Sequence, residues 1–268
     1  MNASTRILWL SDLHFEHQDK VLGHDPIARL SAVIDFINQH YTDAALCLIT
    51  GDMVETATAA NYTAVKSLLD TLKVPWYPMT GNHDNRAMFF NHLPLPDTAM
   101  PGFAQYTIDV PNLRLICLDS LKPGSASGVL CPDRLNWLQA TLEAQPDRPS
   151  AVFLHHPPIP LGLPVLDPDG LENGPDLLDL LSDFPAVKQF FFGHVHRPVT
   201  GQINGLPYTS IRSVLYQAPP PAPAWDWDSF RPATEAPDLG VIDVTANRIN
   251  VQFISFCSAS FGVDPSTA

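Results

Sequence analysis

The sequence predicts an α/β fold in which parallel strand–helix units come first and antiparallel strands follow. Two observations support this class. Up to residue 92, short apolar runs alternate with stretches whose apolar residues recur at helical spacing, as in parallel βαβ units. After residue 197, the stretches 199–211, 239–244 and 248–255 have the turn residues and alternation of antiparallel strands. Hydrophobic residues make up 45% of the 268-residue chain, which is enough for a substantial core.

In the first part of the chain, each expected strand is short, apolar and followed by a polar loop and a helix. Apolar runs predict strands at 6–11, 44–50 and 74–79, and helical spacing predicts helices from Pro26 onward and over 61–72 and 85–92. Pro26 suits the first position of a helix, because the N–H that proline lacks would be unbonded there. Strands joined by helices in this way lie parallel in one sheet.

The middle of the chain begins with a hairpin and then returns to alternation. The same patterns predict strands at 103–110, 113–118, 150–154 and 187–192, and helices at 132–142 and 176–181. Pro111-Asn112 joins the first two of these strands as a tight turn. We therefore expect one core over residues 1–200, with residues 201–268 completing the same domain.

Residues 218–237, here called the Pro/Trp arm, contain six prolines. Because proline is excluded from helix interiors and interior strands, this stretch is expected to be a loop, a lid or an extended arm. Trp225 and Trp227 lie within it, and two tryptophans are unusual in a merely solvated linker. We expect the arm to act as a cap or to mediate a homodimer or higher homo-oligomer.

The overall charge restricts the classes of partner. The formal net charge is -13, which argues against long nucleic acids and anionic membrane surfaces as main partners. It leaves small phosphate esters open, because a bound metal pair can reverse the local field. No apolar run is long enough for a transmembrane helix, and no signal peptide is visible at the N-terminus. The four scattered cysteines show no paired spacing, so a reduced cytoplasm is the expected compartment.

Polar side chains stand where most of the buried strands are predicted to end. They are Asp12, His14, Asp52, Asn82, His83, His155, His194 and His196. Residues two apart on an extended segment point the same way, so Asp12 with His14, and His194 with His196, project together. Taken singly, such motifs also fit surface loops, turns or helix caps. Several of them lie beside glycine, and their repetition at successive strand ends favours one shared site.

The residue types indicate a metal site. Mixed nitrogen and oxygen ligands without cysteine suit Mn, Fe, Zn or Co and argue against a structural zinc site. The set is too large for one ion that must keep an open position. It suits two ions that share a bridging carboxylate and lie about 3.5–4 Å apart, an arrangement that activates water and clamps a phosphoryl group.

The motifs resemble those of the calcineurin-like metallophosphoesterases in order and spacing over roughly residues 6–200. The matching motifs are Asp12-x-His14, Gly51-Asp52, Gly81-Asn82-His83-Asp84, His155 and Gly193-His194-x-His196. Within that superfamily, residues 155–162 and 172–174, together with 125–130, are similar to the bacterial class III cyclic nucleotide phosphodiesterase and glycerophosphodiesterase branch.

This resemblance implies an αββα sandwich of two mixed β-sheets flanked by helices, and two metal ions drawn from Fe, Mn, Zn or Co. It assigns Asp12, His14 and His196 to the first ion, Asn82, His155 and His194 to the second, and Asp52 to a bridging position. A metal-bridging hydroxide would attack phosphorus. His83 would bind a phosphate oxygen and protonate the leaving alkoxide, and Asp84 would orient His83.

The function expected from the resemblance is hydrolysis of small phosphodiesters. The first candidates are 3′,5′-cyclic nucleotides such as cAMP, and glycerophosphodiesters are the alternative. Asn82 and His83 are expected to contact substrate, with Arg197 and Tyr216 as further contacts. Some relatives have a pocket histidine near Tyr216, whereas this chain has no histidine after His196.

Three further expectations concern His156, phosphomonoester substrates and a role without catalysis. His156, next to a candidate ligand, is expected to face away from the metals and to have a structural role. Phosphomonoesterase activity would use the same metal core, although the added arginine pair that would favour it is not evident. A reading from another class is an inactive metal-bound scaffold that binds a partner through the Pro/Trp arm.

Overall fold

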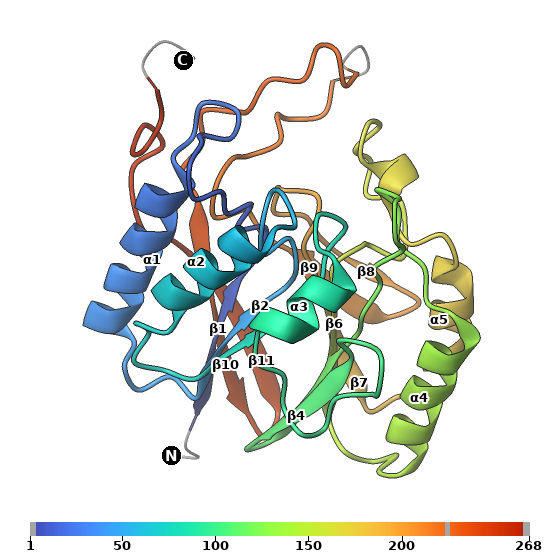
Figure 1. Cartoon of the computed structure of the whole chain (residues 1–268). Coiled ribbons are helices and arrows are strands. Elements are labelled where there is room, and N and C mark those ends of the chain that lie inside the picture. Colours follow the sequence, from blue (N-terminus) through green and yellow to red (C-terminus); the bar gives the residue numbers. More distant parts are fainter. Residues whose placement is uncertain (1–3, 223–225, 265–268) are drawn as a thin grey trace.

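The computed structural model describes residues 4–222 and 226–264. Two mixed β-sheets pack face to face in the centre, and helices cover their outer faces (Figure 1). The predicted αββα sandwich is confirmed.

The first sheet has five strands and combines the two ends of the chain. Its order is β11 (Arg248–Ser255), β10 (Asp238–Thr245), β1 (Thr5–Leu10), β2 (Leu46–Ile49) and β3 (Trp76–Pro78). β1, β2 and β3 are parallel, as expected for strands joined by helices, whereas β10 pairs antiparallel with both β1 and β11. The C-terminal hairpin therefore completes the sheet that begins at the N-terminus.

The second sheet has six strands from the middle of the chain. Its order is β4 (Tyr106–Val110), β5 (Leu113–Cys117), β6 (Ser150–Leu154), β7 (Val187–Phe192), β9 (Leu206–Ser210) and β8 (Thr200–Ile203). β5, β6, β7 and β9 are parallel, and the β4–β5 and β8–β9 pairs are antiparallel hairpins. Asn112 and Asn204 adopt positive φ in the two tight turns, a conformation that asparagine tolerates.

Helices cover the outer face of each sheet (Figure 1). They are α1 (Pro26–His40), α2 (Ala59–Leu69), α3 (Arg86–His92), α4 (Pro132–Glu143) and α5 (Gly174–Ser182). Asp25, Thr58 and Asn85 cap the first three by accepting a hydrogen bond from a backbone N–H of the first turn. Buried residues of α1 and α2 pack on the first sheet, and those of α4 and α5 pack on the second.

Aromatic side chains fill the space between the sheets. Trp9 on β1 meets Phe191 on β7 edge-on, with ring centroids 5.0 Å apart, and Phe191 stacks on Phe153 of β6 at 4.5 Å. The indole N–H of Trp9 donates to Oγ1 of Thr50 at 2.9 Å, so the polar atom of the buried ring is satisfied. This packing holds the ends of β1, β2, β6 and β7 in one place.

The differences from the predicted elements are small. β3 has three residues, and β4 begins at Tyr106 because Phe103 turns back to bond the carbonyl of Met100. A 3-10 helix at Asp167–Asp169 was not predicted. The described part of the Pro/Trp arm contains no helix or strand, as expected; Trp225 lies outside the described residues. Among the described residues, no helix is long and apolar enough to cross a membrane.

Candidate metal centre

The predicted ligands meet at one edge of the sandwich, where several parallel strands end. Five of them adopt a positive φ: Asp12, His14, Asp52, His194 and His196, at 54°, 42°, 49°, 68° and 48°. This left-handed conformation is unfavourable for residues other than glycine. Strain repeated at five neighbouring positions is typical of a functional site, where surrounding structure holds side chains in a required direction.

A first group of donor atoms comes from Asp12, His14, Asp52 and His196. Their ligating atoms all lie within 4.8 Å of one another, and all four residues are buried. Nε2 of His14 lies 3.0 Å from Nε2 of His196 and 3.5 Å from Oδ2 of Asp52. Nε2 of His196 lies 3.4 Å from Oδ1 of Asp12.

A second group of donor atoms surrounds the side-chain oxygen of Asn82. Oδ1 of Asn82 lies 3.1 Å from Nε2 of His155 and 3.1 Å from Nδ1 of His194. Nε2 of His155 lies 3.3 Å from Oδ2 of Asp52. The same carboxylate oxygen therefore faces His14 in the first group and His155 in the second, which is the position of a bridging ligand.

The outward-facing nitrogens of three histidines are already bonded to protein. Nδ1 of His14 lies 2.7 Å from Oε2 of Glu55, Nδ1 of His155 donates to the carbonyl of Thr50 at 2.8 Å, and Nδ1 of His196 donates to the carbonyl of Tyr216 at 3.0 Å. Donation from Nδ1 leaves the Nε2 lone pair directed into the site. Metal-binding histidines have this arrangement, so the residues fit a metal pair.

The electrostatics of the site agree with this fit at Asp12 and at His194. Burial raises the pKa of Asp12, but His196 and His155 together lower it to about 2, so the carboxylate is ionised. Burial and the neighbouring charge of His155 lower the pKa of His194 to about 3, which keeps its imidazole neutral, as a ligand must be. Nε2 of His194 is buried and has no hydrogen-bond partner among the described residues. In the metal-free site, burial lowers the pKa of His155 but the carboxylates of Asp52 and Asp12 raise it to about 9, so a metal ion would have to displace a proton from this imidazole.

The glycines of the motifs allow the loops to approach each other. A Cβ on Gly81 would lie 2.2 Å from Oδ1 of Asp52, and one on Gly51 would lie 2.5 Å from Nδ1 of His155. Gly51 also has a φ of 97°. Any side chain at these positions would displace a candidate ligand, so the two glycines are required for the geometry of the site.

The structure corrects the role expected of Asp84. Its buried carboxylate accepts hydrogen bonds from the backbone N–H of Gly81 and Met53 and from the hydroxyl of Tyr62, and no bond joins it to His83. Nδ1 of His83 instead donates to the backbone carbonyl of Glu55 at 3.0 Å. Asp84 thus holds the loop that carries Asn82 and His83, and Glu55 orients the imidazole of His83.

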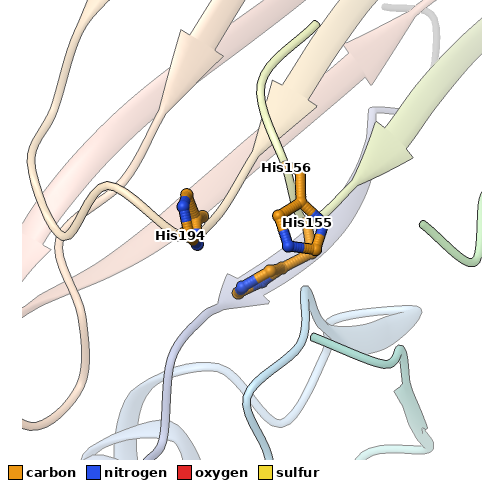
Figure 2. A group of neighbouring side chains, drawn as sticks. All are labelled: His155, His156 and His194. Atoms are coloured by element: carbon orange, nitrogen blue, oxygen red, sulfur yellow. The ribbon is translucent and has the colours of Figure 1, made fainter. Parts of the chain in front are cut away.

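His156 does not face away from the candidate ligands as expected, although its contacts suit a structural role. Figure 2 shows it beside His155 and His194, and the nitrogens of the three rings lie close together. However, Nδ1 of His156 lies 2.7 Å from the hydroxyl of Ser120 and Nε2 lies 3.1 Å from the carbonyl of Ala126. Both nitrogens are occupied by protein, so His156 supports the site from behind and has no lone pair to offer a metal.

A cavity of about 140 Å³ opens in front of the candidate ligands. It is lined by His14, Asp52, Asn82, His83, Ala126, Leu166, Asp169, His194, His196, Tyr216, Ala218, Trp227 and Phe230. Tyr216 and Phe230 have ring centroids 6.4 Å apart, and Phe230 and Trp227 are 5.4 Å apart, so three aromatic rings form one wall. The described lining contains no lysine or arginine.

Arg197, which was expected to contact substrate, is not among the residues that line this cavity. Its guanidinium donates to the carbonyl of Ala218 at 2.6 Å and pairs with Glu235 at 3.1 Å. These contacts attach the Pro/Trp arm to the loop after β7. Tyr216, the other expected contact, does line the cavity, and its ring lies 4.6 Å from that of His196.

The lining or supporting residues that the sequence did not predict as part of the site include Glu55, Asp169, Trp227 and Phe230. Glu55 could have been found, because a carboxylate three residues after Asp52 falls in the same strand-end loop. The composition of the arm marks Trp227 as unusual for a linker, but only the tertiary structure places it at the cavity. Asp169 and Phe230 have no local sequence signal.

A comparison with protein families decides the identity of the chain. Residues 5–198 match the model described as calcineurin-like phosphoesterase. The chain belongs to this family. The predicted resemblance is thereby confirmed for this phosphoesterase, and the site described above lies within the matched residues, apart from the contributions of Tyr216 and the Pro/Trp arm.

Individual relatives agree with the family. This phosphoesterase is 32% identical over 254 residues to a probable cyclic nucleotide phosphodiesterase of Rhodopseudomonas palustris, covering 92% of this chain and 91% of the relative. It is 34% identical over 215 residues to a glycerophosphodiester phosphodiesterase of Enterobacter lignolyticus, covering 78% and 77%. The family and these relatives confirm the prediction of a metal-dependent phosphodiesterase.

The fold also matches a solved structure. A dimetal phosphatase from Danio rerio superposes with a TM-score of 0.69, covering 95% of this chain and 97% of that one, at 14% identity. At this level of identity the match supports the fold alone, and it agrees with the two-sheet sandwich described above.

Proposed function

We propose that this phosphoesterase hydrolyses small phosphodiesters at a pair of metal ions, with 3′,5′-cyclic nucleotides such as cAMP as the first candidates. The observation that carries the proposal is the position of Asp52, whose Oδ2 lies within 3.5 Å of His14 and 3.3 Å of His155. Two groups of nitrogen and oxygen donors thus share one carboxylate, as a binuclear site requires.

The residues that would hold the ions are divided between the two groups. Asp12, His14 and His196 would hold the first, and Asn82, His155 and His194 the second, with Asp52 between them. Fe, Mn, Zn and Co suit this donor set. When bound, such a pair supplies a nucleophilic water at neutral pH and neutralises charge on the phosphoryl group.

His83 is suited to bind a phosphate oxygen and to protonate the leaving alkoxide. It lines the cavity, and its Nδ1 is held by the carbonyl of Glu55, so Nε2 is left for the substrate. Burial lowers the pKa of His83, but the carboxylates of Asp52 and Glu55 raise it above the usual value. The protonated imidazole, which is the form that a general acid needs, is therefore favoured relative to an ordinary histidine.

The cavity wall suits a substrate with a single anionic group. Its described lining carries no lysine or arginine, so a second phosphate would find no cation there. Trp227 and Phe230 offer apolar ring surface to a nucleobase. A cyclic nucleotide has one charged phosphate and one flat base, which matches both features. We infer a cytoplasmic enzyme that acts on soluble metabolites and not on long nucleic acids.

Glycerophosphodiesters are the second candidate, and Asp169 is the observation that favours them. It is an acidic residue in a lining without lysine or arginine, and burial raises its pKa above the usual value. A carboxylate in this position suits the hydroxyl groups of glycerol or the ammonium of ethanolamine as hydrogen-bond donors.

The position of the Pro/Trp arm supports a role for residues 201–268 as a cap over the site. Ala218, Trp227 and Phe230 line the cavity, so the arm covers the site that residues 1–200 provide. A homodimer or higher homo-oligomer through the arm stays a separate proposal. Sedimentation of the full chain beside a chain lacking residues 218–237 tests it, since an unchanged monomer would contradict it.

The experiment that tests the function compares bis(p-nitrophenyl) phosphate with p-nitrophenyl phosphate in the presence of Mn(II). We expect strong activity on the diester, after which cAMP and glycerophosphoethanolamine distinguish the two candidates. Activity on the monoester alone would make this chain a phosphomonoesterase. Bound metal without hydrolysis of either compound would favour the inactive scaffold.

A further inference from the structure

A second cavity, of about 560 Å³, lies beside the Pro/Trp arm and outside the metal centre. Three segments distant in sequence enclose it. Its lining consists of Leu22, His24, Arg231, Pro232, Ala233, Thr234, Ala259, Ser260, Val263 and Asp264. Half of these residues are apolar, and none belongs to the candidate metal ligands.

His24 gives this cavity an unsatisfied polar atom. The residue is only 7% exposed, and no described residue hydrogen-bonds its Nδ1. Its backbone is held in place by two hydrogen bonds with Val21 and by a bridge to Val263. A buried imidazole nitrogen without a partner is unfavourable, so a ligand that supplies the partner would be stabilised there.

Arg231 places a positive charge on the same lining. Its guanidinium donates from Nη1 to the carbonyl oxygens of Phe230 and Asp228, and no described carboxylate forms an ion pair with it. Asp264, the acidic residue of the lining, is paired with Lys20 at 3.0 Å. The cavity therefore combines apolar walls with one cation and one buried polar nitrogen.

We propose that this cavity is a second ligand site for a small organic acid with an apolar body. The apolar part of the ligand packs between Leu22, Pro232 and Val263. Its carboxylate pairs with Arg231, and His24 supplies a further hydrogen bond through Nδ1. Charge complementarity selects an acid over an amine, since arginine binds carboxylates through charge-assisted hydrogen bonds.

The second site is connected to the metal centre through Tyr216. The ring of His24 lies 6.3 Å from that of Tyr216, which in turn lies 5.1 Å from His14. The arm is also tied to this segment, because the N–H of Ala233 donates to the carbonyl of Gln217 at 2.9 Å. A ligand beside His24 therefore alters the wall of the catalytic cavity and changes KM for the diester. The expected change in KM rests on the proposed function, whereas binding of the organic acid to the second site does not.

The first experiment is titration calorimetry of the Mn(II)-loaded full chain with octanoate, in the absence of substrate. We expect saturable binding, weakened about tenfold by Arg231→Gln because a charge-assisted contact is lost. Ala259→Phe, which fills the cavity, is expected to abolish it. Arg248→Gln, which removes an exposed arginine from β11, is the matched control and is expected to bind as the wild type does.

Two results would overturn the proposal. One is the absence of saturable heat up to millimolar octanoate. The other is binding that neither Arg231→Gln nor Ala259→Phe weakens, which would place the carboxylate at the metal centre. The kinetic test measures KM for bis(p-nitrophenyl) phosphate with and without octanoate in the wild type and Ala259→Phe. An inactive wild type that still binds octanoate through Arg231 would refute the proposed function and leave the second site in place.

Discussion

The carboxylate of Glu55 lies 2.7 Å from Nδ1 of His14. It also lies 3.5 Å from Nδ1 of His83, and the backbone carbonyl of Glu55 accepts a hydrogen bond from the same nitrogen. One residue thus orients both a candidate metal ligand and the candidate general acid. These contacts of Glu55 leave Nε2 of His14 and Nε2 of His83 directed into the site.

Removal of this contact is expected to weaken metal binding. We expect Glu55→Ala to lower Mn(II) affinity by about 10–100-fold, the usual effect of losing a partner that orients a metal-binding histidine. Glu55→Gln, which can still accept from Nδ1 of His14, is expected to lose less. Competition with a metal chelator measures the affinity. Glu143→Gln, on the exposed side of α4, is the control, and equal affinity of Glu55→Ala and wild type would refute the role.

Asn82 is expected to be required for the second ion in particular. Its Oδ1 lies 3.1 Å from both His155 and His194, and no atom of an alanine side chain could replace that oxygen. We expect Asn82→Ala to bind about one Mn(II) where the wild type binds about two. Activity on bis(p-nitrophenyl) phosphate is expected to fall about 100-fold. Elemental analysis after desalting gives the stoichiometry, with Asn247→Ala as control. Two Mn(II) ions bound to Asn82→Ala would show that Asn82 is not a metal ligand.

Asp84 is expected to make the metal-free protein less stable as the pH rises. Burial, followed by the charge of Asp52, raises the pKa of Asp84 from 3.8 to about 7 in the folded state. The folded state therefore holds this proton more tightly than the unfolded state does. The stability that the proton contributes is complete below about pH 4 and is lost as the pH rises through about 7.

The measurement is urea denaturation of the chelated protein between pH 4 and pH 8. Asp84→Asn is expected to lack this part of the pH dependence, because its side chain cannot ionise. Asp147→Asn, in an exposed loop, is expected to follow the wild type. The same slope in Asp84→Asn and wild type would show that another group is responsible.

Trp227 is expected to affect nucleotide binding more than the chemical step. Contact between a base and an aromatic ring contributes about 1–3 kcal/mol, so Trp227→Ala is expected to raise KM for cAMP about tenfold or more. The kcat for methyl p-nitrophenyl phosphate, which has no base, is expected to stay within about twofold. Trp137→Ala, on α4, controls for a general loss of stability. An unchanged KM for cAMP would show that the base does not contact this wall of the cavity.

The strand–helix alternation and the set of candidate metal ligands could be predicted from the sequence alone. Apolar runs and helical spacing reflect the immediate environment of each segment, and parallel strands place their carboxyl ends together, so Asp12, Asp52, His155 and His194 could be collected before any contact was known. The antiparallel pairing of β10 with β1 was not specified by the sequence, because it joins segments more than 200 residues apart, such as Thr5 with Val244.

Tertiary structure decided the partner of each polar side chain. Asp84 follows His83 in sequence, yet its carboxylate bonds the backbone of Gly81 and Met53. Glu55, and not Asp84, orients the imidazole of His83. Arg197 follows His196 yet pairs with Glu235 in the arm. Neighbours in a chain turn their side chains in different directions, and the partner available in each direction comes from whichever remote segment packs there. Local sequence therefore determined where chemistry could be placed, and long-range packing determined which atoms carry it.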